Sequence, residues 1–254
     1  MDFCACFSLP GRIALAAVLA VGLVAVAHGQ GPEAPQARGT ASVATTNFGG
    51  GAGAVRPVPP AKRGGLEPES EISVTGMIPD GDYRLFSATV RCRAWTVGVE
   101  YDRKIGHLFG ARLDYSTEII PIMVLSQPAV SDYWGNAVSP NQQDVPGFSI
   151  SPVGFRFLYR DHKKIRPIFV GHLGAAAFAR KALSPNASYV NFNVQASAGV
   201  QYAVAERWDL RVEPFQFFHV SNGYLAASNP GMDEIGWKVG FTYHLGRGAT
   251  GVTR

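Results

Sequence analysis

Residues Val190–Tyr202 read VNFNVQASAGVQY, with an apolar or small side chain at every second position and a polar or small one between. Consecutive side chains of a β-strand point to opposite faces, so this run predicts a strand with one apolar and one polar face. The same alternation recurs around Trp95–Tyr101, Phe109–Tyr115 and Val153–Tyr159, and again in the closing run Ile235–Leu245. The chain is therefore predicted to be all-β.

Two β folds contain strands of this kind. A soluble barrel turns its apolar faces inward, whereas a transmembrane barrel turns them outward toward lipid. The predicted strands run for about ten residues or more, which suits a tilted membrane crossing. Aromatic residues such as Trp95, Tyr202 and Trp237 recur on the apolar faces, as expected for the aromatic girdles of a membrane barrel. These features favour the transmembrane barrel.

The connections between the predicted strands alternate in length. Short ones are expected near Lys104–Gly106, Asp161–Lys164 and Ala205–Glu206, and long ones near Ser126–Val145, Arg180–Ser188 and Asn222–Met232. Outer-membrane barrels alternate short periplasmic turns with long external loops in this way. Seven strands are clear, at about 93–103, 107–124, 148–160, 165–178, 189–204, 207–221 and 233–245, and the first lies in Ile72–Met77 or Arg84–Cys92. We therefore predict an eight-stranded antiparallel transmembrane β-barrel of the outer membrane.

The interior of an eight-stranded barrel is filled by side chains. The residues expected to form a paired polar core there are Glu100, Asp102, Arg112, Asp114, Arg156 and Lys238.

The remaining segments follow from composition. Residues 1–29 are predicted to be a secretory signal peptide, because Arg12 precedes the apolar run Ile13–Ala27. Residues 30–70 are rich in Gly, Ala and Pro and are expected to be a flexible linker. Residues 71–245 form the barrel domain and 246–254 a C-terminal tail. The net charge of +4 is scattered, without a basic stripe of interleaved aromatics, so the sequence does not support a nucleic-acid partner.

Polar residues gather where the last two predicted strands meet. His219 and Ser221 share one strand face because they are two residues apart. Asp233 starts the otherwise apolar face of the last strand, whereas Glu234 lies on the opposite face. A serine becomes a nucleophile when an imidazole that a carboxylate orients takes its proton. This pattern predicts Ser221 as nucleophile, His219 as general base and Asp233 as the orienting carboxylate of an esterase.

The loop between these strands offers Asn222 and Asn229, whose amides would donate hydrogen bonds to an oxyanion. The same residues are also consistent with a purely structural role, in which the strand ends and an Asn-Pro-Gly turn follows. A non-catalytic outer-membrane barrel with a structural or envelope-interaction role is therefore the alternative. A soluble lipid carrier with its apolar face inward is a third hypothesis. No histidine has metal-ligand spacing to a second histidine or cysteine.

The end of the chain, His219-x-Ser221-Asn222 followed by Asn229-Pro230-Gly231 and an acidic residue, resembles the lipid A 3-O-deacylase family of outer-membrane acyloxyacyl hydrolases. Upstream, Ile165–Phe169 with Gly174–Phe178 resembles the family's fifth strand, and Asn191-Phe192 followed by Ala198–Val200 its sixth. The resemblance covers about 93–245.

The resemblance implies a barrel that removes an ester-linked acyl chain from lipid A with a triad on its lipid-facing wall. It implies the roles already given to Ser221, His219 and Asp233, with Asn229, and less directly Asn222, at the oxyanion or in the loop shape. It implies no cofactor, and it leaves open whether the partner is lipid A (lipopolysaccharide) or another membrane lipid, and whether the protein forms a homodimer. The family's third member is Glu, so Asp233→Glu is expected to be tolerated.

Overall fold

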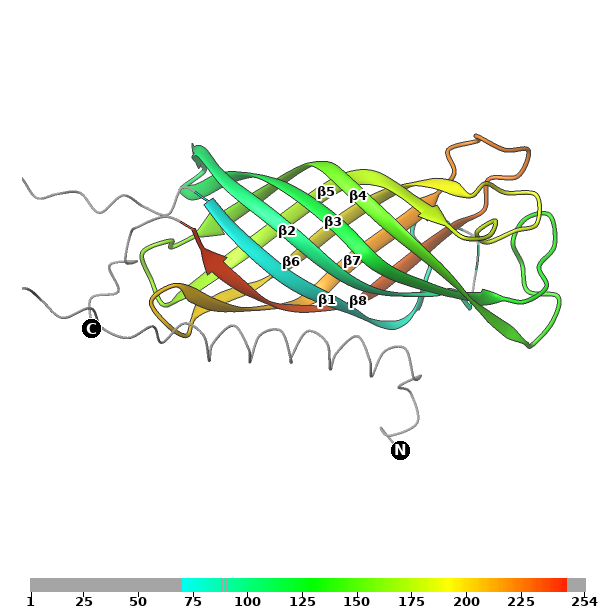
Figure 1. Ribbon diagram of the computed structural model, residues 1–254, viewed down its shortest axis with the longest axis horizontal. Coiled ribbons are helices and arrows are strands. Elements are labelled where there is room, and N and C mark those ends of the chain that lie inside the picture. The colour runs from blue at the N-terminus through cyan, green and yellow to red at the C-terminus, as the bar shows by residue number, and fades with distance from the viewer. Residues whose placement is uncertain (1–69, 88, 90, 246–254) are drawn as a thin grey trace, which may run out of the picture.

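Eight antiparallel strands follow one another around a closed barrel in the computed structural model of the protein (Figure 1). The structure describes residues 70–87, 89 and 91–245. The strands are β1 Ser70–Tyr83, β2 Arg93–Leu108, β3 Ala111–Pro128, β4 Gln142–Tyr159, β5 Ile165–Phe178, β6 Val190–Ala203, β7 Trp208–Ser221 and β8 Gly231–His244. The predicted eight-stranded barrel is confirmed, and its first strand occupies the earlier of the two predicted positions.

The signal peptide at 1–29, all but the last residue of the linker at 30–70 and the tail at 246–254 lie outside the described residues. Within the described part of the chain, no helix is long and apolar enough to cross a membrane.

The connections lie at two different ends of the barrel. Residues 109–110, 160–164 and 204–207 turn at one end. The longer loops 129–141, 179–189 and 222–230 and the described residues between β1 and β2 lie at the other, on the right of Figure 1. The prediction of a turn near Lys104–Gly106 was wrong, because β2 continues past a register shift there to Leu108. The chain turns instead at Phe109 and Gly110, whose φ angles of 53° and 76° suit a two-residue hairpin turn.

The apolar faces of the strands point outward. Along β6, Val190, Phe192 and Val194 are exposed, whereas the residues between them are buried in the barrel. The same alternation holds on β8, where Trp237 is exposed and Lys238 is buried. An apolar outer wall and a polar interior are the pattern of a membrane barrel, so the hypothesis of a soluble carrier with an inward apolar face is wrong.

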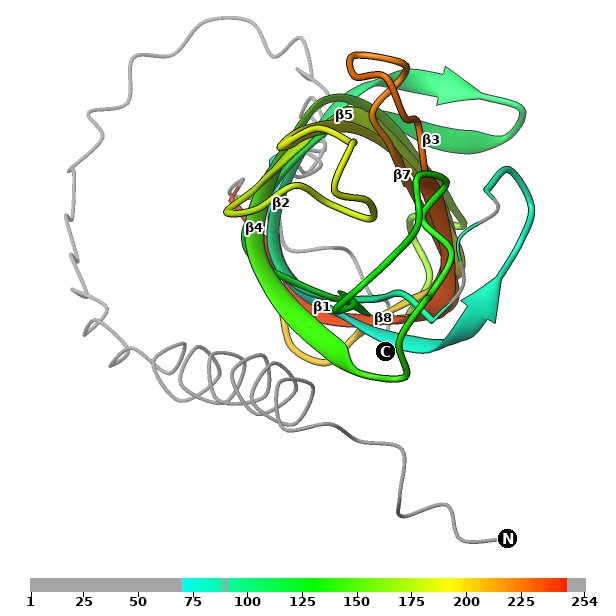
Figure 2. The same ribbon diagram turned by 90° about the vertical axis from the view of Figure 1, so that its right-hand side faces the viewer.

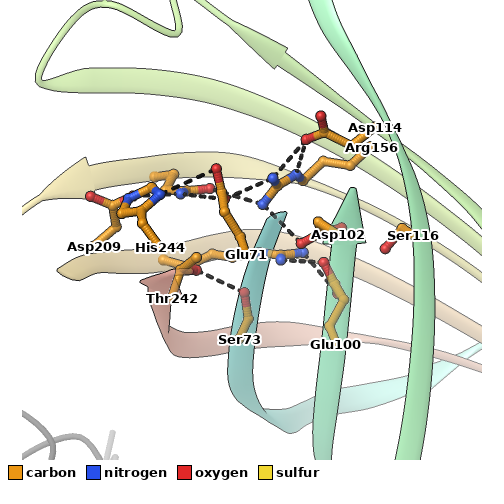
Figure 3. A network of polar contacts seen from close by, with 12 residues as sticks. Glu71, Ser73, Glu100, Asp102, Asp114, Ser116, Arg156, Asp209, Thr242 and His244 are labelled. Atoms are coloured by element: carbon orange, nitrogen blue, oxygen red, sulfur yellow. Dashed lines mark hydrogen bonds and ion pairs between the residues drawn. The ribbon is translucent and has the colours of Figure 1, made fainter. Parts of the chain in front are cut away.

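Buried charges fill much of the interior (Figure 3). The guanidinium of Arg156 lies 2.7 Å from a carboxylate oxygen of Glu71, 2.9 Å from one of Asp102 and 2.6 Å from one of Asp114. The predicted polar core is confirmed, since its six members are all buried: Glu100, Asp102, Arg112, Asp114, Arg156 and Lys238. Pairing of this kind matters because a buried charge without a partner is strongly destabilising.

Toward the long loops the interior becomes apolar. The buried cluster there is Met77, Cys92, Ala94, Ile120, Met123, Leu125, Val145, Ala176, Phe178, Ala182, Leu183, Phe218, Val220 and Met232. Leu183 belongs to the β5–β6 loop, and Figure 2, which looks onto this end, shows this yellow loop and the green β3–β4 loop crossing the mouth of the barrel. Phe218 and Val220 are the inward neighbours of His219 on β7, so a packed core supports this end of the strand.

Candidate active site

A β-bulge in β7 decides where His219 and Ser221 point. In the first half of the strand the odd-numbered residues are buried in the barrel, up to Glu213. The register with β8 then shifts between Glu213 and Gln216, and one extra residue enters β7. Pro214 lies in this bulge, which suits it because proline has no N–H to give to a ladder. After the bulge the odd-numbered residues point outward, which brings His219 and Ser221 to the lipid-facing wall.

His219, Ser221 and Asp233 meet on this wall. Asp233 pairs with His219 across β7 and β8, and its Oδ1 atom lies 2.7 Å from His219 Nδ1. The Nε2 atom of His219 lies 3.2 Å from Ser221 Oγ. A carboxylate accepts hydrogen bonds only, so Nδ1 carries the proton and Nε2 accepts the serine hydroxyl. Hydroxyl, imidazole and carboxylate therefore stand in the order that general-base activation of a serine needs.

Asp233 and His219 differ in how far they are exposed. The carboxylate of Asp233 is fully buried, whereas the His219 side chain keeps 15% of its surface exposed. Glu234 lies on the opposite face of β8, and its Oε2 atom accepts a hydrogen bond from the Ala94 amide at 3.2 Å inside the barrel. Asp233 rather than Glu234 thus faces His219.

The β1–β2 loop also contacts Asp233, which sequence reasoning missed. The backbone amides of Leu85, Phe86 and Ser87 donate to Asp233 Oδ2 at 2.6, 2.6 and 2.9 Å. Backbone amides are common to every residue except proline, so no side-chain pattern marks this contact in the sequence.

The two predicted asparagines differ in their contacts. Asn222 is buried, and its Nδ2 atom donates to the Ser228 carbonyl at 2.6 Å while its Oδ1 atom accepts the Tyr224 amide at 2.9 Å. These bonds close the loop 222–230 on itself. Among the described residues, the buried Oδ1 atom of Asn229 has no hydrogen-bond partner. Asn229 stands two residues before Gly231, which pairs with Ser221 across the strands.

An apolar groove of about 270 Å³ lies on the wall formed by β4, β5 and β6. Val194 lines it and pairs directly with His219 across β6 and β7, so the groove begins one strand away from the triad. The other large apolar residues along it are Val153, Phe155, Phe157, Phe169 and Leu173. Gly171 adds no side chain, so the wall is open at that position. Such a groove suits an extended hydrocarbon chain.

A second cluster of polar groups lies inside the barrel. Glu100, Glu118 and His172 place ligand atoms within 4.8 Å of one another in the described part of the chain. The ammonium of Lys238 lies 2.8 Å from Glu118 Oε1 and 3.3 Å from Glu100 Oε2, where it already balances the two carboxylates. Ser116 Oγ lies 2.8 Å from His172 Nε2, but both residues are buried. This cluster is an ion-pair core without access for a lipid.

Comparison with known protein families identifies the family of this chain. The model of the family described as "Lipid A 3-O-deacylase (PagL)" matches residues 108–242, just over half of the 254 residues. The chain belongs to the lipid A 3-O-deacylase family. The resemblance predicted from the sequence is thus confirmed. All of the residues predicted for the site fall inside the stretch that matches the lipid A 3-O-deacylase family, namely His219, Ser221, Asn222, Asn229 and Asp233.

Solved structures similar to this member of the lipid A 3-O-deacylase family include the following three. The crystal structure of the outer membrane enzyme PagL has 15% identity and a TM-score of 0.47, and the match covers 67% of this chain and 97% of that one. Neisserial surface protein A has 10% identity and a TM-score of 0.35, over 69% and 94%. OprG from Pseudomonas aeruginosa has 12% identity and a TM-score of 0.38, over 70% and 97%. No curated protein matches the chain.

Proposed function

We propose that this protein is a serine esterase of the bacterial outer membrane that removes an ester-linked acyl chain from lipid A. Ser221 is the nucleophile, His219 the general base and Asp233 the group that orients His219. The observation that carries this proposal is the chain of contacts from Ser221 Oγ through His219 to Asp233 on the outer wall. A triad in that position meets its lipid substrate within the membrane. Membership of the lipid A 3-O-deacylase family supports lipid A as that substrate.

The first half of the reaction forms an acyl-enzyme. His219 Nε2 takes the proton of the Ser221 hydroxyl as Oγ bonds to the ester carbonyl carbon. The tetrahedral intermediate collapses, the bond from this carbon to the lipid oxygen breaks, and Nε2 returns its proton to the leaving alkoxide. Asp233 stays ionised throughout and stabilises the transient imidazolium.

The second half of the reaction restores the enzyme. A water molecule gives its proton to His219 Nε2 as its oxygen attacks the acyl carbon. The bond to Ser221 Oγ breaks, Oγ recovers the proton from Nε2, and the fatty acid leaves. No step in this sequence needs a cofactor.

Two further features of the wall fit these steps. Asn229 supplies a side-chain amide near the start of β8 and is our candidate donor to the oxyanion, whereas Asn222 shapes the loop. The groove that begins at Val194 accepts the acyl chain, because its aromatic and aliphatic lining offers close van der Waals contacts to an extended hydrocarbon chain.

Mass spectrometry of lipid A tests the proposal. Cells that express the wild type or Ser221→Ala are compared with cells that express Ser116→Ala, which removes the other serine that contacts a histidine. We expect lipid A with one acyl chain fewer for the wild type and Ser116→Ala only. Purified protein is also given phospholipid in mixed micelles. If Ser221-dependent cleavage is found with phospholipid alone, phospholipid and not lipid A is the substrate. If neither lipid is cleaved in a Ser221-dependent way, the non-catalytic barrel is favoured.

A further inference from the structure

The β1–β2 loop begins beside the triad. The ladder between β1 and β8 ends at the pair Tyr83 and Asp233, so the next residues of the chain leave the sheet next to the Asp233 side chain. The amides of the loop segment Leu85–Ser87 then all donate to a single atom, Asp233 Oδ2. Three donors of neighbouring residues that converge on one oxygen form a concave anion site.

The two oxygens of the Asp233 carboxylate accept hydrogen bonds from different donors. Oδ1 accepts the His219 Nδ1 proton, and Oδ2 accepts the three loop amides. A carboxylate held at both oxygens cannot rotate about its last bond without losing hydrogen bonds. The loop segment Leu85–Ser87 therefore fixes the direction from which Asp233 meets the imidazole.

Phe86 connects the loop segment to the triad through its side chain. Its ring meets the ring of His219 edge-on at 6.0 Å between centroids, and that of Phe217 at 5.9 Å. Edge-to-face pairs of this kind are favourable beyond the area that they bury. Phe86 keeps 72% of its surface exposed, so its ring lies on the outside of the barrel next to the triad.

We propose that the loop segment Leu85–Ser87 is a positioning element of the triad, in which the backbone amides orient Asp233 and the Phe86 ring holds the segment against β7. This inference rests on the proposed function, since it assigns a role in the same reaction. Phe86 acts on the reaction through Asp233, because its ring keeps the three amides in place, and it does not bind the substrate. The loop segment Leu85–Ser87 also matches the length of the Asp233 side chain. A carboxylate carried on one more carbon would not accept hydrogen bonds from both His219 Nδ1 and the three loop amides in the same way.

Kinetics of the full-length protein in mixed micelles of detergent and lipid A test the role of Phe86. We expect Phe86→Ala to lower kcat roughly tenfold with KM unchanged, because small misplacements of catalytic groups cost rate. Phe86→Tyr, which keeps the ring, should restore the wild-type rate. Phe109→Ala is the matched control, since Phe109 is 84% exposed at the opposite end of the barrel.

A double-mutant cycle separates positioning from substrate binding. In the Asp233→Ala background, Phe86→Ala should change kcat by less than about twofold, since the group through which it acts is gone. A rise in KM at constant kcat would overturn the proposal, because Phe86 would then contact the acyl chain. An equal loss of kcat in both backgrounds would also overturn it.

Amide hydrogen exchange of Leu85, Phe86 and Ser87, measured by NMR in micelles, gives a second result that does not depend on activity. Asp233→Ala should accelerate exchange at all three amides, whereas Ser221→Ala should not. Unchanged exchange in Asp233→Ala would refute the positioning element. If the wild type and Ser221→Ala hydrolyse lipid A equally, the proposed function fails, and the exchange data alone then decide whether the loop segment holds Asp233.

Discussion

The Nδ1 atom of His219 lies 2.7 Å from the Oδ1 atom of Asp233, across the last strand pair of the barrel. The pairing register of β7 and β8 brings these two residues face to face. Ser221 is two residues further along the same face of β7 and completes the set.

The two histidines that contact serines should behave differently. His219→Ala should reduce ester hydrolysis by roughly 10⁴-fold or more, because the general base is lost. His172→Ala removes the contact with Ser116 inside the barrel and should leave the rate per folded molecule unchanged. Initial rates on lipid A micelles measure both. Comparable losses in the two variants would argue against His219 as the base.

The two neighbouring acidic residues should also differ. Asp233→Ala should slow hydrolysis by roughly 10³–10⁴-fold, since the imidazole loses the group that fixes its tautomer. Glu234→Ala should leave the rate within about threefold, because Glu234 faces the barrel interior and makes none of the contacts that join Asp233, His219 and Ser221. The assay needs normalisation to folded protein, which heat-dependent gel mobility provides. Loss of activity in Glu234→Ala with a folded barrel would contradict the assignment.

Asp233→Glu should be poorly tolerated, which reverses the expectation from the family resemblance. The additional methylene displaces the carboxylate by about 1.5 Å, the length of one carbon–carbon bond. The longer side chain therefore cannot keep both the His219 contact and the three amides of the loop segment Leu85–Ser87. We expect kcat to fall at least about tenfold. A rate equal to the wild type would mean that the loop adjusts to either length.

The groove next to Val194 should control the length of the acyl chain. At Gly171 an added Cβ would meet only one atom, at 3.8 Å, so Gly171→Leu would place its side chain in the groove. We expect kcat/KM to fall for 4-nitrophenyl laurate but not for the acetate ester. Gly106→Leu is the control, because Gly106 faces open space on another strand. Equal effects on the two esters would place the acyl chain elsewhere.

Arg156 should be the residue whose loss most damages the fold. Arg156→Ala leaves the buried carboxylates of Glu71, Asp102 and Asp114 without their shared cation. Breaking a buried ion pair from one side costs about 3–5 kcal/mol of unfolding free energy. Urea titration in micelles measures this loss, with Arg103→Ala, an exposed arginine on β2, as the control. A similar urea midpoint for the Arg156→Ala and Arg103→Ala variants would mean that other interior groups compensate for the loss of the Arg156 guanidinium.

Much of the barrel follows from strand periodicity. Val194 on β6 and Trp237 on β8 belong to long runs in which apolar and polar residues alternate, and these runs identify the outward face of each strand. A shift of the strand register by one residue would turn the apolar side chains inward, so the register is strongly specified. Turns were harder to place, because the β2–β3 hairpin closes on Phe109 and Gly110 rather than on a stronger turn sequence. At Ile105 one extra residue enters β2, and the strand runs on to Leu108 past the predicted turn.

The sequence by itself determined the membrane barrel and the three residues that come together on its wall. Alternation sets which face is apolar, and the spacing of His219, Ser221 and Asp233 on adjoining strands sets their common face. Only the tertiary structure decided two other matters. The bulge at Pro214 turns that face toward lipid, because one extra residue inverts the side-chain order of the strand. The amide of Phe86 reaches Asp233 across 147 residues of chain, and a contact made by backbone atoms leaves no trace in the choice of side chains.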